Sequence, residues 1–397
     1  MSKPARTAIV LFFLALAVRV ALGAWTGMSG PPVEDERGYT LLAQSVAQGR
    51  GFELPVPDSD ALPRTSFRAP VVPLLYAPLA ALGGGVRAFR TLTILIGALG
   101  SPLLYFAARK SALGERAVWA AAAYALWPPA VYESVRVFCE PSSQALLVGA
   151  LALLVAAPVP AAAGGGVLAA LAVLARPAAL VPAALVLFAA GSRRRATAFA
   201  LAFVVVLAPW IIRNWDLHGR PLLTTNSGVT LVGGNSDVVA AAEHPGKWAP
   251  PERVYAGRAD PPDLGMWGWS ALGEEASDRR FSSDAVRWVA EDPVRAARLG
   301  FWKLVRLVDP DPRSEKDDAG AKSIAGWLTF APVLVLACIG ALRGERMWWM
   351  LVAGTALTAL VFYGDTRMRT CADPALLVFA AYGVVCVTRR LRGRGVD

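Results

Sequence analysis

Long apolar blocks separated by short basic clusters are the feature that most constrains how this chain can fold. The first block covers residues 8–25, which is about the length that crosses a bilayer as a helix. A backbone inside lipid must satisfy its own N–H and C=O groups, so such blocks form helices. Of the 397 residues, 55% are hydrophobic and 18% charged, whereas soluble chains average about 25% charged. The sequence therefore predicts an all-α polytopic membrane protein.

The apolar blocks predict a bundle of about ten transmembrane helices. The predicted spans cover residues 8–25, 88–108, 118–132, 142–157, 165–175, 178–190, 196–212, 324–342, 347–363 and 372–387. Arg19 lies near the outer end of the first span, and we expect its side chain to extend along the helix to the membrane surface. Residues 69–82 are also apolar but rich in proline, and we predict that they form a juxtamembrane helix on the outer face.

The distribution of basic residues predicts the orientation of these spans. The predicted inner loops hold Arg109, Lys110, Arg116, Arg193, Arg194, Arg195, Arg343, Arg346, Arg389, Arg390, Arg392 and Arg394, and the short outer connections hold only Arg136, Arg176, Arg367 and Arg369. This asymmetry predicts a multi-pass protein of the inner (plasma) membrane with cytoplasmic N- and C-termini. Counting residues 69–82 as a span would invert the orientation of every later loop and place Arg193, Arg194 and Arg195 outside the cytoplasm. Because the net charge of +10 resides at span ends, we do not expect nucleic-acid binding.

The order of spans and loops divides the chain into three predicted parts. Residues 1–212 form an N-terminal transmembrane module that includes a first outer loop at 26–87. Residues 213–323 form a large extracytoplasmic loop, and residues 324–397 supply the C-terminal transmembrane helices. Within the large loop, residues 294–308 combine apolar and cationic side chains as an interfacial helix does. We expect this loop to form a helical layer without an independent core.

An acidic cluster, Glu34-Asp35-Glu36, directly follows the first span and predicts a reactive site. Carboxylates at the mouth of a membrane helix are costly to desolvate unless a cation or a reaction uses them. Leu42 and Ala43 belong to an apolar stripe at helical spacing after the cluster, so we expect a helix along the membrane surface. The alternative is that the carboxylates only favour a helix N-terminus, an effect of about 0.3–1 kcal/mol.

A second acidic set, which includes Glu140, lies at the outer end of the third span. It can meet the first set if the first and third spans pack side by side. One carboxylate can then act as a general base toward a hydroxyl, and a second can orient the group or hold a divalent cation beside a phosphate. Cations available for a phosphate on the same face are Arg64, Arg68, Arg136, Arg213, Lys303, Arg367 and Arg369. The two histidines and four cysteines lack metal-site spacing.

Several short motifs resemble one family when they are taken in their order along the chain. They are Asp35-Glu36-Arg37-Gly38-Tyr39, Arg68-Ala69-Pro70, Glu140-Pro141, Leu174-Ala175-Arg176-Pro177, Pro209-Trp210-Ile211-Ile212-Arg213-Asn214 and Arg367-Met368-Arg369. The chain resembles the GT-C fold glycosyltransferases, in the glycosyltransferase family 39-type branch of protein O-mannosyltransferases and the aminoarabinose transferase that modifies lipid A. Met368 departs from this family, which usually has an aromatic residue at that position.

The resemblance implies a GT-C-like bundle and a polyprenyl-phosphate-linked sugar as donor. The acceptor hydroxyl would belong to a glycan, lipid or protein at the extracytoplasmic face, and transfer would invert the anomeric centre. By this resemblance Asp35 is the general base and Glu36 a supporting catalytic acid. The implied phosphate-binding residues are Arg68, Arg213, Lys303, Arg367 and Arg369. Glu140, with Asp35, would be the candidate ligand of a possible divalent cation.

Three other readings of the sequence stay open. A transporter or flippase of lipid-linked sugars would be expected to show internal repeats and polar residues at mid-membrane, whereas the polar residues here gather at one face. A surface-polysaccharide polymerase or ligase would share the donor chemistry. A membrane scaffold without catalysis would leave the acidic cluster unexplained.

Overall fold

The computed structural model describes residues 1–33, 35–55, 62–156, 158–257, 273–310 and 321–392. Within these ranges the chain forms helices α1 to α19, three short 3-10 turns and an isolated β-bridge between Glu53 and Arg64. The prediction of an all-α protein is confirmed. Glu34, the first residue of the predicted acidic cluster, lies outside the described residues.

The predicted spans correspond to the helices of a membrane bundle. Among the described residues, four helices are long and apolar enough to cross a membrane, namely α1 (Lys3–Thr26), α4 (Val86–Arg109), α10 (Arg193–His218) and α19 (Asp373–Leu391). The other predicted positions hold α5 (Ala117–Leu126), α6 (Pro128–Ser134), α7 (Glu140–Leu154), α8 (Val159–Ala175), α9 (Leu180–Val186), α16 (Ala321–Ala341) and α17 (Arg346–Val361). The chain is a multi-span membrane protein.

Two groups of helices make up the bundle. In the first, α1, α4, α7, α8 and α10 pack in that order, and in the second, α16 packs on α19 while α17 packs on α9. Contacts between α19 and α5 join the groups. Small residues allow close approach: a Cβ on Gly166 of α8 would lie 2.2 Å from the carbonyl oxygen of Phe199 in α10. Contacts of α1 with α5 and α6 confirm that the first and third spans lie side by side.

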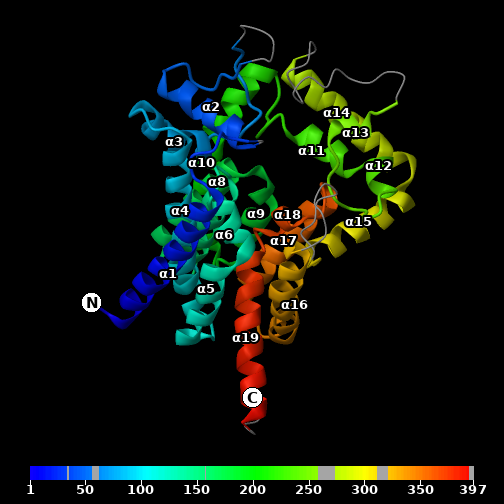
Figure 1. The fold of residues 1–397 in the computed structure, drawn as a ribbon. Coiled ribbons are helices and arrows are strands. Elements are labelled where there is room, and N and C mark those ends of the chain that lie inside the picture. The colour runs from blue at the N-terminus through cyan, green and yellow to red at the C-terminus, as the bar shows by residue number, and fades with distance from the viewer. Residues whose placement is uncertain (34, 56–61, 157, 258–272, 311–320, 393–397) are drawn as a thin grey trace.

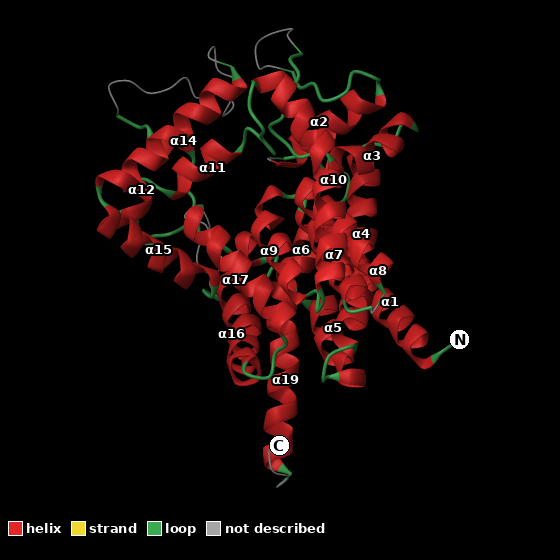
Figure 2. Ribbon diagram, turned by 180° about the vertical axis from the view of Figure 1, so that it is seen from behind, coloured by secondary structure: helices red, strands yellow, loops and turns green. Residues whose placement is uncertain are grey.

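Both chain termini lie at one end of the bundle, and α2 (Asp35–Ala47), α3 (Val71–Ala81) and α14 (Glu274–Glu291) lie at the opposite end (Figure 1). The view from behind shows the same arrangement (Figure 2). We call the end of the bundle that carries α2, α3 and α14 the α2 end. With 11 residues, α3 is about 16 Å long, whereas a membrane core is about 30 Å thick. This length agrees with a juxtamembrane helix and not with a span.

A layer of helices from the predicted large loop lies beside the bundle, toward its α2 end (Figure 1). It contains α11 (Ser227–Gly234), α12 (Asp237–Ala240), α13 (Pro251–Val254), α14 and α15 (Pro293–Leu307). We expected no core here, but the layer has a small apolar cluster of its own, which includes Val232, Phe281 and Trp288. Phe67, from the segment before α3, belongs to the same cluster. The apolar cluster of this layer is therefore completed by Phe67, a side chain from outside the large loop.

The third span is broken, in contrast to the continuous helix predicted over residues 118–132. It divides into α5 and α6 at Trp127, whose backbone is extended (ψ 114°). Pro128 and Pro129 follow directly, and a residue before proline is driven away from helical geometry. The break lies within the bundle, where Trp127 is buried in the main apolar core, and Glu140 begins the next helix, α7.

The same break explains the position of Arg19. Helix geometry would pair the carbonyl of Ala125 with the N–H of residue 129, but Pro129 has none. The Nη1 atom of Arg19 donates to that carbonyl at 3.1 Å, and its Nε atom donates to the Ser134 hydroxyl at 3.1 Å. Arg19 is fully buried, so the expectation that its side chain reaches the membrane surface is wrong. It instead supplies a donor to a carbonyl left free by proline.

Candidate active site

The position of Asp35 is fixed by the buried face of α2. The apolar stripe predicted after the acidic cluster is buried: Tyr39, Leu42 and Ala43 are at most 4% exposed. Tyr39 and Ala43 pack with Val72 of α3 and other apolar residues of α3 and α4. Because α2 begins at Asp35, this packing fixes the position of the first helical turn and of the carboxylate that it carries.

Both oxygens of the Asp35 carboxylate accept hydrogen bonds from arginines. The Nη2 atom of Arg68 lies 2.7 Å from Oδ1, and the Nη2 atom of Arg367 lies 2.9 Å from Oδ2. Arg68 precedes α3, and Arg367 is in α18 (Thr366–Arg369), between α17 and α19. The Asp365 side chain caps α18 by accepting from the Arg367 N–H at 3.1 Å. The site thus joins the two ends of the sequence.

Arg367 also connects Asp35 to Glu140. Its Nη2 and Nε atoms lie 2.8 and 2.9 Å from Oε1 of Glu140, and Arg176 approaches the same oxygen at 3.6 Å. We call the series Arg68, Asp35, Arg367, Glu140 and Arg176 the ion-pair chain. Three guanidinium groups and two carboxylates leave it with one positive charge in excess. A partly buried site with excess positive charge favours an anion.

Exposure differs along the ion-pair chain. The Glu140 side chain is fully buried and that of Arg176 is 8% exposed, whereas Asp35 is 23% and Arg367 39% exposed. Asp35 and Arg367 are therefore the members most accessible to a ligand. The buried Glu140 carboxylate, which Arg176 also approaches, fixes the position of Arg367 from the protein interior.

The arginines control the protonation of Asp35. Burial by itself would raise the pKa of the carboxyl group, but the guanidinium groups of Arg68 and Arg367 outweigh this effect and hold the pKa well below its usual value. Asp35 is thus ionised at neutral pH. A carboxylate with so low a pKa accepts a proton poorly while both arginines stay in place.

Glu36 has different partners. Its carboxylate is fully buried and accepts from Nε and Nη2 of Arg90 at 2.9 and 2.8 Å and from the backbone N–H of Val137 at 2.8 Å. Arg136 approaches it at 3.5 Å. These contacts join α2 to α4 and to the segment before α7. The predicted catalytic role of Glu36 stays a prediction, and its geometry is that of a group that positions α2.

The structure brings two of the five predicted phosphate-binding residues, Arg68 and Arg367, to Asp35. Arg369 lies behind them: it donates to Asp373 at 2.8 Å and to the carbonyl of Leu307 at 3.0 Å, and it stacks on Phe330. The role predicted for Arg369 stays untested.

Lys303 is enclosed between α15, α11 and α17. Its ammonium group donates to Oδ1 of Asn235 at 2.7 Å and to the carbonyl of Leu360 at 3.1 Å, and the residue is 1% exposed. Burial lowers the pKa of Lys303 to about 7. The α17–α18 connection passes so close that a Cβ on Gly364 would lie 1.9 Å from the Lys303 carbonyl oxygen. A phosphate can reach this ammonium group only if these elements move.

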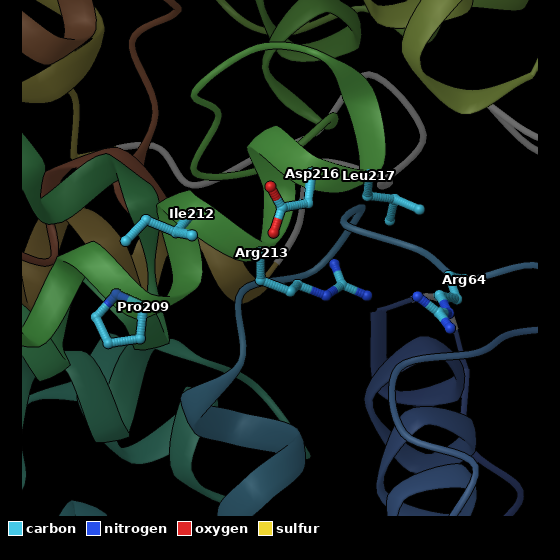
Figure 3. A pocket seen from close by; sticks show the side chains of 6 residues that line it. All are labelled: Arg64, Pro209, Ile212, Arg213, Asp216 and Leu217. Carbon is cyan, nitrogen blue, oxygen red and sulfur yellow. The ribbon is translucent and has the colours of Figure 1, made fainter.

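Arg213 lines a separate pocket of about 320 Å³. Its Nη1 atom donates to the Thr65 carbonyl at 3.0 Å and to the Ser66 hydroxyl at 2.7 Å. Figure 3 shows its guanidinium group and that of Arg64 directed toward one another, with Asp216 on the other side of Arg213. Arg213 thus lies in a second cationic region, outside the ion-pair chain.

The arrangement does not fit a divalent cation between Asp35 and Glu140. The Arg367 guanidinium occupies the position between these carboxylates, with contacts of 2.9 and 2.8 Å. Among the residues that the structure describes, His, Cys, Asp and Glu nowhere gather in a group of three or more suited to a metal. The predicted metal-ligand role of Glu140 therefore gains no support from its surroundings.

Sequence reasoning gave no role of their own to two members of this region, Glu133 of the second acidic set and Arg176 of the outer connections. Arg176 is buried, approaches Glu140 and donates to the Thr370 hydroxyl. Glu133 is 4% exposed, and its Oε2 atom has no hydrogen-bond partner among the described residues. The signal for both was a charged residue that directly follows a predicted span, 118–132 for Glu133 and 165–175 for Arg176, because charges close to the membrane interior mark functional regions.

Comparison with known proteins identifies the fold. No protein-family model and no curated protein sequence matches the chain. Solved structures do match over nearly its whole length, and they define the class of fold: the chain has a GT-C fold, as predicted.

The matching structures include those of the oligosaccharyltransferase AglB from Archaeoglobus fulgidus. The apo form gives a TM-score of 0.57 at 14% identity, covering 98% of this chain and 51% of that one. The complex with an inhibitory peptide and a dolichol-phosphate gives 0.54 at 13% identity, with 99% and 52% covered. A complex with Zn and sulfate gives 0.53 at 13% identity, with 98% and 50% covered. The chain thus spans about half the length of AglB.

Proposed function

We propose that this chain is an integral membrane glycosyltransferase of the family 39-type branch, which transfers a sugar from a polyprenyl-phosphate donor to an acceptor hydroxyl. The observation that carries the proposal is the ion-pair chain. Its two most exposed members, the Asp35 carboxylate and the Arg367 guanidinium group, lie in contact, and the five residues together have one positive charge in excess. A base and an anion site side by side are what this transfer requires. The dolichol-phosphate bound by AglB, a protein of the same fold, supports the class of donor.

In the proposed reaction the acceptor oxygen attacks the anomeric carbon while the bond from that carbon to the phosphate oxygen breaks. The acceptor proton passes to Asp35, and the bonding electrons leave with the lipid phosphate. Arg68 and Arg367 stabilise the charge that develops on this leaving group. In-line displacement inverts the anomeric centre. Glu140 and Arg176 hold Arg367, and Glu36 fixes α2 so that Asp35 keeps its position.

The proposed topology places the α2 end outside the cytoplasm. The C-terminal end of α19, the helix that carries Arg389 and Arg390, lies at the opposite end (Figure 1), which supports a cytoplasmic C-terminus. We therefore retain residues 1–212, 213–323 and 324–397 as the three parts of the chain. A cysteine at Ala256 should react with an impermeant reagent added outside the cell, and one at Ser192 should not; the reverse labelling would overturn this topology.

The function is tested with purified protein and a panel of polyprenyl-phosphate sugars, together with candidate acceptors. The expected result is release of free lipid phosphate and a product of inverted anomeric configuration from at least one donor. Movement of an intact donor across a liposome membrane without cleavage would contradict the proposal and favour a flippase. Elongation of a lipid-linked glycan would favour a polymerase.

A further inference from the structure

We propose that the donor phosphate and Asp35 compete for the same two arginines, so that binding of the donor releases the Asp35 carboxylate to act as a base. This inference rests on the proposed function and adds an order of events to it. The enzyme without donor would hold its base in two ion pairs. Only a bound phosphate would take up the guanidinium groups and set that base free.

The competition follows first from the geometry, because both oxygens of the Asp35 carboxylate accept hydrogen bonds from the two arginines. Arg68 and Arg367 each direct an Nη2 atom at Asp35, at 2.7 and 2.9 Å. A phosphate would need those N–H donors, since a guanidinium group binds oxyanions through the same planar edge that it offers a carboxylate. The donor phosphate is a diester with one negative charge, like the carboxylate, and the lipid monophosphate that leaves during transfer carries more charge and one more free oxygen.

Burial determines which partners can exchange. Arg367 keeps Glu140 when it leaves Asp35, because that contact is made by a fully buried carboxylate that Arg176 also approaches. The exchange therefore involves the exposed side of Arg367 and the neighbouring Arg68, and the fold behind them stays intact. The excess positive charge means that a phosphate can enter without displacing any carboxylate from the protein interior.

The surroundings of Asp35 favour its action as a base once the arginines turn away. The titratable or charged groups that act on it or on its partners come from several elements. They are Arg68, Arg367, Tyr39, Cys139, Glu140, Glu133, Arg176 and Tyr363. Burial alone raises the pKa of Asp35, and the charge of Glu140 acts in the same direction. Loss of the two ion pairs therefore turns a weak base into a stronger one.

The competition is tested by binding farnesyl phosphate, a short prenyl monophosphate, to the detergent-purified full chain. In Asp35→Asn the competing charge is gone, so the Kd should fall by about tenfold relative to the wild type. Asp35→Ser, which leaves more space, should show the same direction. Glu53→Gln removes one negative charge from the segment that joins α2 to α3 and is the matched control, for which we expect a change of less than about twofold.

The outcomes separate this inference from the proposed function. Asn and Ser variants that bind farnesyl phosphate no better than the wild type, or worse, would overturn the competition even if the wild type transfers sugar. Tighter binding by both variants, with no donor cleaved by the wild type, would keep the competition and overturn the glycosyltransferase function. A wild type that does not bind farnesyl phosphate at all would contradict the competition directly.

A kinetic readout gives the same distinction in the active enzyme. The pH profile of kcat/KM for the donor reports the free enzyme, and that of kcat reports the donor complex. The competition predicts that the acidic limb of kcat lies at higher pH than the acidic limb of kcat/KM. Coincident limbs would contradict it.

Discussion

Asp35 and Glu36 are consecutive residues, yet they lie in two different regions of charge. Asp35 is at the accessible edge of the ion-pair chain, with Arg68 and Arg367 as partners, whereas Glu36 is enclosed with Arg90 and a backbone N–H. The difference arises because successive side chains on a helix point about 100° apart. Exposure, and not the presence of a carboxylate, separates the group that can meet a substrate from the group that holds the fold.

The largest effect that we expect from this comparison is on stability at Glu36. Glu36→Gln leaves Arg90 as a buried cation without its ionic partner, and breaking such a pair costs about 3–5 kcal/mol. The midpoint of thermal unfolding of the purified protein should therefore fall strongly. Asp35→Asn, with a partly exposed side chain, is the matched variant and should change the midpoint little. Equal loss of stability in both variants would remove the distinction between the two regions.

The next effect concerns the anion side of the ion-pair chain. Arg367→Gln removes a donor aimed at the proposed leaving group, and loss of one such donor costs about 10²–10³ in rate. Steady-state transfer with the active donor measures this loss. Arg367→Lys keeps the charge but not the planar fork, so it should recover part of the activity. Full activity in Arg367→Gln would show that the phosphate does not use this arginine.

Lys303 gives a test by pH, at a cation outside the ion-pair chain. Its pKa is lowered to about 7 in the folded protein, whereas an unfolded lysine titrates near 10.4. Between these values the unfolded chain binds more protons, so stability should rise as pH increases from about 7 to 10. Lys303→Met should abolish this contribution, whose slope is at most about 1.4 kcal/mol per pH unit, as measured by unfolding midpoints across that range. The exposed Arg298 on the same helix supplies the control, and Arg298→Gln should retain the rise.

The smallest effect is expected at the second cationic region. Arg64 is exposed at the edge of the Arg213 pocket, and Arg64→Gln should change the transfer rate by less than about threefold, as typical of an exposed charge. A loss as large as that of Arg367→Gln would move the phosphate site from the ion-pair chain to the pocket.

Local sequence patterns predicted most of the fold. The spans follow from apolar length, and the buried stripe of α2 follows from helical spacing, because both depend on residues close in sequence. The break at Trp127 was also visible in Pro128-Pro129, but the apolar block was read through it. The buried position of Arg19 was not predictable, because its partners Ala125 and Ser134 belong to another helix.

The candidate site was predicted only in part, for the same physical reason. The motif around Asp35 and the arginines of residues 367–369 were singled out, but nothing in their spacing shows that Arg367 and not Arg369 meets Asp35. That choice depends on α18, a single turn whose capping by Asp365 sets which side chain points outward. Arg176 was overlooked because its partner, Glu140, lies on a neighbouring helix.

Sugar transfer by Asp35→Asn, compared with the wild type at saturating donor and acceptor, tests the proposed chemistry most directly. Loss of a general base predicts a rate lower by about 10²–10⁴, with farnesyl phosphate still bound and the unfolding midpoint preserved. A folded Asp35→Asn protein that transfers sugar within about threefold of the wild-type rate would contradict the assignment of Asp35 as the base.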